Sequence, residues 1–199
     1  MSKTALCHGF ADPVDPFTAG SVVVREGAGV VAFRGAPPPA GVDDLFRRIA
    51  GVVHVGGLPL AWLETAGGRG GFFRGDLVAV GEEDVRRLTS AVLAGLPSLQ
   101  GAWVRAPEVY AAVVRVLLAH EIGHAVQAKL GVERRGPAAE QGADLTAGWI
   151  AEALGWPAWG DAIVLSAAGD PGTGSHPSPA ARVAAYREGR RMRRARLAA

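Results

Sequence analysis

The chain has 199 residues, of which 49% are hydrophobic and 20% charged, a composition typical of one globular domain and not of a disordered protein. It contains a single cysteine, Cys7, which excludes an intramolecular disulfide and favours a reducing, cytoplasmic environment. Arg115 interrupts the longest apolar run before it reaches the ~18 residues of a membrane span. The N-terminus lacks the apolar core of a secretory signal. We therefore expect a soluble protein without a membrane partner.

The formal net charge of +2 is unevenly distributed. Residues 187–196 contain six arginines and one glutamate, a local charge of +5, so that the remaining residues sum to −3. We therefore treat 187–199 as a basic C-terminal tail. The tail has no aromatic residue on which a base can stack, which favours a solvated helix end over a nucleic-acid-binding segment.

Local patterns predict β structure in the N-terminal half. Alternating β-prone residues and turn residues indicate a hairpin, and later apolar runs indicate further strands. Acidic residues in the first turn favour a helix beginning at Glu82. The expected elements are an irregular segment (1–20), two hairpin strands (21–25 and 30–33), a helix (42–50), two strands joined by a glycine-rich loop (60–65 and 72–80) and a helix (82–96).

The C-terminal half is predicted to be helical. Pro107 suits the first turn of a helix, and Gly131 suits its end. The expected helices cover 107–130, 137–154, 156–168 and a segment from about Pro179 into the tail, with a loop over 170–179. The domain is thus expected to span 21–186. Its fold class is α+β, with a small N-terminal antiparallel sheet on a mainly helical C-terminal half.

The sequence His120-Glu121-Ile122-Gly123-His124 has the pattern H-E-x-x-H within the longest predicted helix. Residues four apart lie on one face of a helix, so both imidazoles can bind one zinc ion at about 2.0–2.1 Å. Glu121 lies beside the first histidine and can take a proton from the attacking water. The apolar residues before the motif indicate that this helix is buried.

A second pair of residues four apart, Glu140 and Asp144, lies on the following helix. The short connection at 131–136 should pack the two helices side by side and bring Glu140 near the histidines as the third ligand. Asp144, one turn deeper, should accept the other ring N–H of His120. We therefore expect one zinc ion per chain, held by His120, His124 and Glu140.

Two segments around these residues resemble a known family. HEIGHAVQ (120–127) and EQGADLTAGWIA (140–151) are similar to bacterial neutral zinc metallopeptidases and, more broadly, to gluzincin peptidases of the HtpX and CaaX-protease type. The resemblance implies a zincin-like fold, with Glu140 as third zinc ligand and Asp144 behind the metal. It also suggests that the strand at 72–80 carries the sheet edge that pairs with the substrate backbone.

A third segment, Ser175 to Pro179 with Arg182, resembles the S/T-H-P…R segment of these peptidases. The resemblance implies that His176 and Arg182 help to bind the oxyanion formed during peptide hydrolysis. From the residues alone, His176 is equally compatible with a loop position before a helix, and Arg182 with bracing its helix against an acidic neighbour. For His54, within an apolar run, a structural role is favoured. For Cys7, a free thiol is favoured over a zinc-capping thiolate.

The sequence therefore predicts a soluble, cytoplasmic zinc metalloendopeptidase that acts on a peptide or protein substrate, with Glu121 as general base. The alternative is a catalytically inactive, zinc-stabilised binding or regulatory protein. The family's membrane helices are missing from this sequence, so membrane substrates are not expected. The substrate, the oligomeric state and a latent role for 1–20 stay open.

Overall fold

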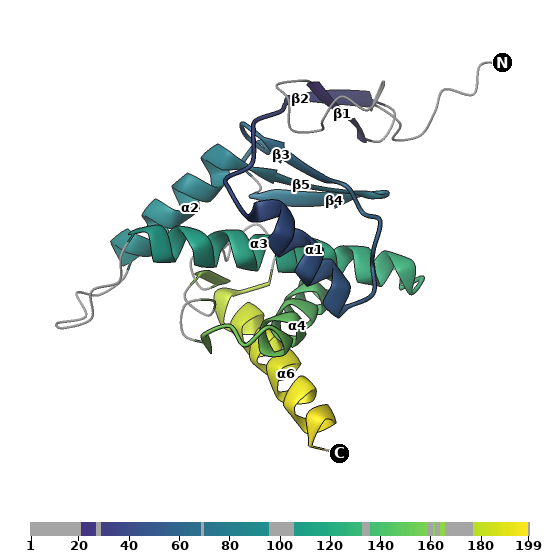
Figure 1. Cartoon of the computed structure of the whole chain (residues 1–199), viewed down its shortest axis with the longest axis vertical. Coiled ribbons are helices and arrows are strands. Elements are labelled where there is room, and N and C mark those ends of the chain that lie inside the picture. The colour runs from purple at the N-terminus through teal and green to yellow at the C-terminus, as the bar shows by residue number, and fades with distance from the viewer. Residues whose placement is uncertain are drawn as a thin grey trace.

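A computed structural model describes residues 21–26, 29–68, 70–95, 106–132, 136–158, 161, 164–165 and 177–198. Within these ranges the chain is α+β, as expected, and is arranged in layers (Figure 1). A two-stranded hairpin lies above a small sheet, and helices lie below it. The expectations for residues 1–20, including Cys7, for most of the helix at 156–168 and for His176 fall outside the described residues.

The central sheet is mixed, which corrects the antiparallel sheet expected from the sequence. Its strands are β3 (Leu60–Leu63), β4 (Gly71–Arg74) and β5 (Leu77–Gly81), in the order β3-β5-β4. β3 runs parallel to β5, whereas β4 is antiparallel to it. The single strand expected at 72–80 is wrong, because the chain reverses at Gly75 and Asp76. Gly75 has φ 62°, and Arg74 pairs with Leu77 across this two-residue turn.

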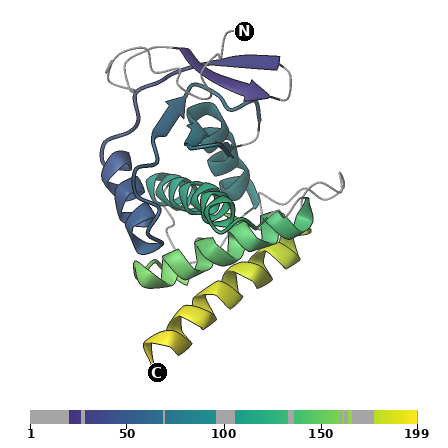
Figure 2. The same cartoon turned by 90° about the vertical axis from the view of Figure 1, so that its right-hand side faces the viewer.

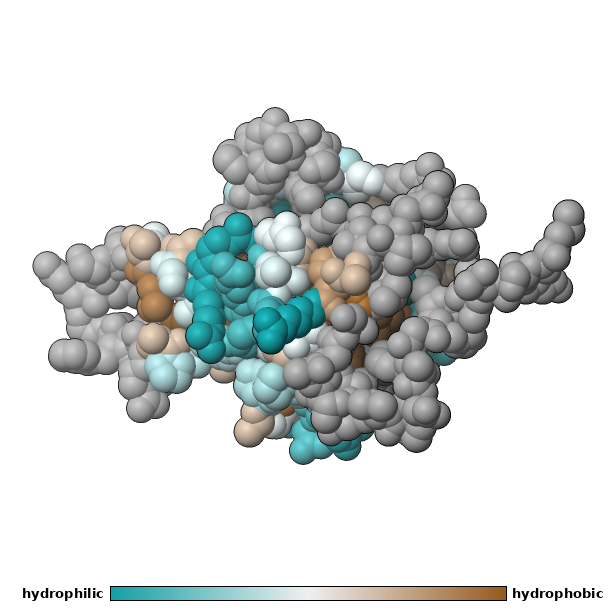
Figure 3. Space-filling model, turned by 90° about the horizontal axis from the view of Figure 1, so that it is seen from above, coloured by the Kyte–Doolittle hydropathy of each residue, from teal (hydrophilic) through white to brown (hydrophobic). Residues whose placement is uncertain are grey.

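The expected hairpin is confirmed as β1 (Ser21–Glu26) and β2 (Gly29–Arg34), which pair antiparallel. Val22 and Phe33 are register partners and both pack on the upper face of the sheet. The Phe33 and Phe72 rings lie 5.2 Å apart. Figure 3 views this side from above: among the coloured residues, hydrophilic side chains gather near the middle and apolar ones lie on either side. The hairpin thus shields apolar residues of the sheet.

The main core lies under the sheet, where three helices meet its lower face. These are α1 (Val42–Val52), α2 (Glu82–Gly95) and α3 (Ala106–Lys129). Trp62, Val78 and Val80 point down from the sheet into one apolar cluster with side chains of all three helices. By length and composition α3 is able to cross a membrane, but 72% of its apolar window is buried, and core helices of soluble proteins meet the same criterion.

Two further helices, α4 (Pro137–Ala153) and α6 (Pro179–Leu197), pack below α3 (Figures 1 and 2). They approach each other so closely that two glycines are required at the contact. A Cβ atom on Gly148 would overlap the Tyr186 carbonyl, and one on Gly189 would overlap the Leu145 carbonyl. This backbone contact fixes α6 tightly against α4.

The expected boundary between domain and tail at 186 and 187 falls inside α6, which continues without a break to Leu197. Arginines of this half of the helix are held by α4. Arg190 and Arg194 contact Glu152 at 2.9 and 2.6 Å. Arg193 and Arg196 lie over the Trp149 ring, 5.2 and 5.8 Å from its centroid. The basic segment is therefore part of the folded domain.

Candidate metal centre

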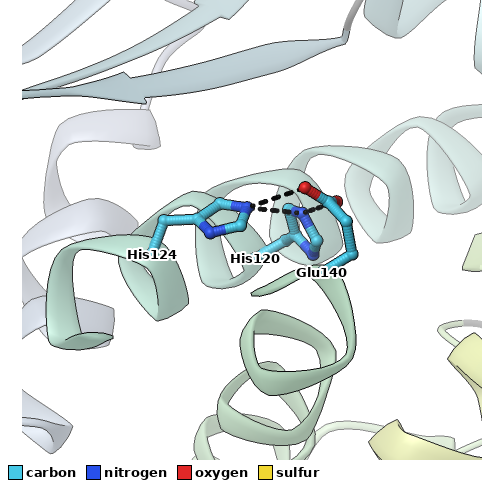
Figure 4. A group of neighbouring side chains, drawn as sticks. All are labelled: His120, His124 and Glu140. Atoms are coloured by element: carbon cyan, nitrogen blue, oxygen red, sulfur yellow. Dashed lines mark hydrogen bonds and ion pairs between the residues drawn. The ribbon is translucent and has the colours of Figure 1, made fainter. Parts of the chain in front are cut away.

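Three side chains from α3 and α4 converge, as the sequence predicts: His120 and His124 from one face of α3, and Glu140 from the first turn of α4 (Figure 4). Gly123 allows α4 to come this close, because a Cβ atom there would lie 2.7 Å from the Cα of Ala143. The Gln127 side-chain amide also donates to the Ala139 carbonyl at 2.9 Å. The helices thus form a rigid support for the three side chains.

The spacing of the donor atoms suits a tetrahedral ion. Ligand atoms about 2.0–2.1 Å from a common zinc ion, at tetrahedral angles, lie roughly 3.3 Å from one another. His120 Nε2 lies 3.2 Å from His124 Nε2 and 3.1 Å from Glu140 Oε2. His124 Nε2 lies 3.5 Å from Glu140 Oε1. Two imidazoles and one carboxylate are also the donor types that zinc hydrolases use. The two Glu140 distances involve different carboxylate oxygens, and with one donor atom from each residue the three atoms lie within 4.8 Å of one another. The residues can therefore hold a zinc ion, with one further position for water.

Asp144 lies behind His120, as expected, and orients it. The carboxylate oxygen Oδ1 accepts a hydrogen bond from His120 Nδ1 at 2.8 Å. Asp144 is fully buried, and the exposed fraction of His120 is only 6%. In the neutral ring, a proton held on Nδ1 by Asp144 leaves the lone pair of Nε2 directed toward the cluster, as a metal bound at Nε2 requires.

Arg182 contacts Asp144 from the opposite side. Its Nε donates to Oδ2 and its Nη2 to Oδ1, both at 2.8 Å, in a bidentate ion pair. The sequence left two roles for this arginine, oxyanion binding and bracing against an acidic neighbour. The fork toward Asp144 is the bracing arrangement, and sequence reasoning alone did not identify the acidic partner.

The buried charges shift one another's pKa values. Burial opposes protonation of His120, but the hydrogen bonds to Asp144 and Glu140 outweigh it and raise the His120 pKa to about 9. Burial would raise the pKa of Asp144, yet the bonds from Arg182 and His120 hold it below its usual value. The histidines likewise hold the Glu140 pKa below its usual range, against the effect of burial. Both carboxylates are thus kept ionised beside the histidines.

Glu121 is buried at 5% exposure, and this burial raises its pKa, although His120 and His124 oppose the shift. The side chain lies under the sheet edge. A Cβ atom built on Gly71 of β4 would be 3.3 Å from Glu121 Oε1. Gly71 therefore provides space for the carboxylate, a role that the sequence alone did not reveal.

The remaining histidine candidates are not brought to this cluster by any described contact. His54 lies in the loop after α1 with φ 56°, and its carbonyl accepts a hydrogen bond from the Lys129 ammonium at 2.6 Å. This contact involves the backbone, and the His54 residue itself is exposed, so the structural role favoured from the sequence stays a prediction. His176 lies outside the described residues, so its role in oxyanion binding stays a prediction.

Comparisons with protein-family models, with curated proteins and with solved structures find no match for this chain. The geometry of the residues themselves is therefore the basis for the function proposed below.

Proposed function

We propose that the chain is a soluble, cytoplasmic zinc-dependent peptidase of the gluzincin type, with a zincin-like fold and a peptide or protein substrate. The observation that carries this proposal is the convergence of His120, His124 and Glu140 from two helices, with a buried carboxylate, Glu121, next to the first ligand. His120 and Glu121 are buried and His124 and Glu140 are partly buried, and ionisable groups withdrawn from water in this way are costly unless an ion or mutual pairing compensates them.

Zinc bound by His120, His124 and Glu140 would polarise the scissile carbonyl and acidify the attacking water. Glu121 takes the proton from this water and passes it to the leaving amine. A carboxylate is a better base when its pKa approaches the working pH, and burial moves the Glu121 pKa in that direction. Asp144 keeps the His120 ring oriented throughout.

The position of β4 supports a peptide as substrate. In the order β3-β5-β4, β4 lies at the edge of the sheet, and within the described residues no strand pairs with its outer side. An extended peptide can add to such an edge through backbone hydrogen bonds. Because Gly71 adjoins Glu121, a peptide added there would pass close to the proposed base.

The decisive experiment combines metal analysis of the purified protein with a peptide-library cleavage assay. We expect about one zinc per chain and cleavage that disappears in Glu121→Gln while zinc stays bound. Bound zinc without any cleavage, in the wild type as in Glu121→Gln, would instead support the zinc-stabilised binding or regulatory protein. Absence of zinc binding would reject both functions.

A further inference from the structure

The arginine behind the metal centre belongs to a third helix. The proposed ligands come from α3 and α4, whereas Arg182 comes from α6, near its N-terminal end. The N-terminus of α6 is capped by Ser178, whose hydroxyl accepts from the Ala181 amide at 3.3 Å. No ligand atom is supplied by the described part of α6, but Arg182 of this helix binds Asp144, the carboxylate that accepts from His120.

The contact between the helices is direct and buried. Arg182 is 6% exposed and Asp144 is fully buried. A buried bidentate pair has one narrow geometry, because both oxygens of the carboxylate are used by the guanidinium fork. Two of the three guanidinium nitrogens, Nε and Nη2, are committed to it at 2.8 Å.

One oxygen of Asp144 is shared. Oδ1 accepts from Arg182 Nη2 and from His120 Nδ1, each at 2.8 Å, and the two donors are themselves 3.3 Å apart. The fork therefore fixes the direction from which the carboxylate meets the imidazole. If α6 shifted away, the carboxylate would lose both bonds from Arg182 and with them its fixed orientation.

We propose that Arg182 is a positioning residue that couples zinc binding at His120 to the docking of helix α6, through the bond path Arg182–Asp144–His120. Coupling between two equilibria is reciprocal. If docked α6 strengthens zinc binding by a given factor, bound zinc strengthens the docking of α6 by the same factor. The inference depends on the metal centre of the proposed function but not on peptidase activity.

The first test measures zinc affinity by competition with a chromophoric chelator. Arg182→Ala should weaken binding by about 10–100-fold, the usual cost of losing a partner behind a ligand. The matched control is Arg190→Ala, because Arg190 is an equally buried arginine of α6 that pairs with Glu152 instead. This variant keeps the backbone contacts at Gly148 and Gly189 and the fork on Asp144, so α6 stays docked and the zinc affinity should stay within about twofold of the wild type.

A double-mutant cycle separates positioning from a direct role. Because Arg182 acts through Asp144, the affinity of Asp144→Ala/Arg182→Ala should equal that of Asp144→Ala alone. The proposal would be overturned if the losses of zinc affinity in Asp144→Ala and Arg182→Ala multiplied in the double variant. It would also be overturned if Arg182→Ala bound zinc as tightly as Arg190→Ala. If Arg182→Ala does not fold, Arg182→Lys keeps the charge but loses the fork, and wild-type affinity in that variant also overturns the proposal.

The second test measures the reciprocal effect by hydrogen exchange. Zinc should slow amide exchange in α6 of the wild type by the same factor that Arg182 adds to zinc affinity, and Arg182→Ala should remove this protection while α3 stays protected. Unchanged α6 exchange on zinc binding would refute the coupling and leave the peptidase proposal standing. A wild-type protein that binds no zinc would overturn both.

Discussion

Two fully buried aspartates, Asp144 and Asp161, lie in the helical half of the molecule and behave oppositely. Asp144 receives two bonds from Arg182 and one from His120, and its pKa is held below the usual value despite burial. Asp161 accepts from the Tyr186 hydroxyl, and burial raises its pKa beyond what this bond and the nearby arginines compensate.

The difference lies in the partners and not in the depth of burial. Arg115 approaches Asp161 Oδ1 only to 3.6 Å, and within the described residues this oxygen has no hydrogen-bond donor. Asp144 contacts His120, a proposed metal ligand, directly. Asp161 instead contacts Arg115 of α3 and Tyr186 of α6, neither of which is a proposed ligand. A buried carboxylate thus points to a functional site when its partners keep it charged and oriented.

The largest expected effect is a loss of turnover that occurs only when a residue of the metal centre near Asp144 is changed. Glu121→Gln removes the general base and should lower turnover by about 10²–10⁴-fold without releasing zinc. Tyr186→Phe, the control on the Asp161 side, should leave turnover unchanged. Steady-state cleavage of a peptide selected from the library, with metal content measured in parallel, distinguishes them. Equal losses in both variants would mean that the two regions do not differ in function.

The next largest expected effect is the difference in zinc affinity between variants of the two aspartates. Asp144→Ala should weaken zinc binding by about 10–100-fold, because His120 loses the acceptor that orients it. Asp161→Ala should change zinc affinity by no more than about twofold, since it shares no partner with the ligands. Both affinities are measured by chelator competition on folded protein, checked by circular dichroism. An Asp144→Ala variant with wild-type affinity would reduce Asp144 to a packing residue.

A change beside Asp161 should lower the stability of the fold and leave zinc binding unchanged, which is the opposite of the pattern expected at Asp144. Tyr186→Phe leaves the buried Asp161 Oδ2 without its donor and should lower the free energy of unfolding by about 1–3 kcal/mol. Zinc affinity should not change. Urea unfolding followed by tryptophan fluorescence gives the first quantity, and chelator titration the second. A loss of zinc affinity without a loss of stability would show that the Asp161 cluster communicates with the metal after all.

The smallest expected effect is the change in zinc affinity for each unit of pH. In the metal-free protein the His120 pKa of about 9 lies above its ordinary value of 6.5, so pairing stabilises the fold fully below about pH 6.5, and this stabilisation is lost as pH rises through about 9. Zinc requires the neutral ring and must displace the proton. Zinc affinity should therefore rise about tenfold per pH unit below about pH 9.

The matched variants sharpen this pH test. Asp144→Asn removes a charge that raises the His120 pKa, so its zinc affinity should level off at a lower pH than in the wild type. Asp161→Asn should keep the wild-type profile. Affinities measured from about pH 6 to about pH 8.5 suffice for the comparison. A wild-type profile that is flat over this range would contradict the raised pKa.

The sequence predicted the convergence of the candidate ligands because this depends on local rules. Two pairs of residues four apart and one short connection bring His120, His124, Glu140 and Asp144 together. The partner of Arg182 was left open, since it depends on how α6 packs against α4. The close approach at Gly123 was missed for the same reason, because a glycine inside a helix indicates no particular neighbour until the packing is known.

The sheet was predicted less well. The pair Gly75-Asp76 is a hairpin signal within an apolar run, and it was available in the sequence. Treating 72–80 as one strand overlooked it. The parallel pairing of β3 with β5 was not predictable from local patterns, since it depends on β4 occupying the antiparallel position beside β5.

The glycine contacts of the helical layer have a consequence for folding order. Gly123, Gly148 and Gly189 each lie inside a helix, where glycine costs about 1 kcal/mol relative to alanine. This loss of helix stability is offset only when the helices pack with their backbones in contact. We therefore expect α4 and α6 to be weakly helical in the early folding chain and to become stable on docking, so that the metal-binding residues are assembled late, after the sheet and α3 have formed their core.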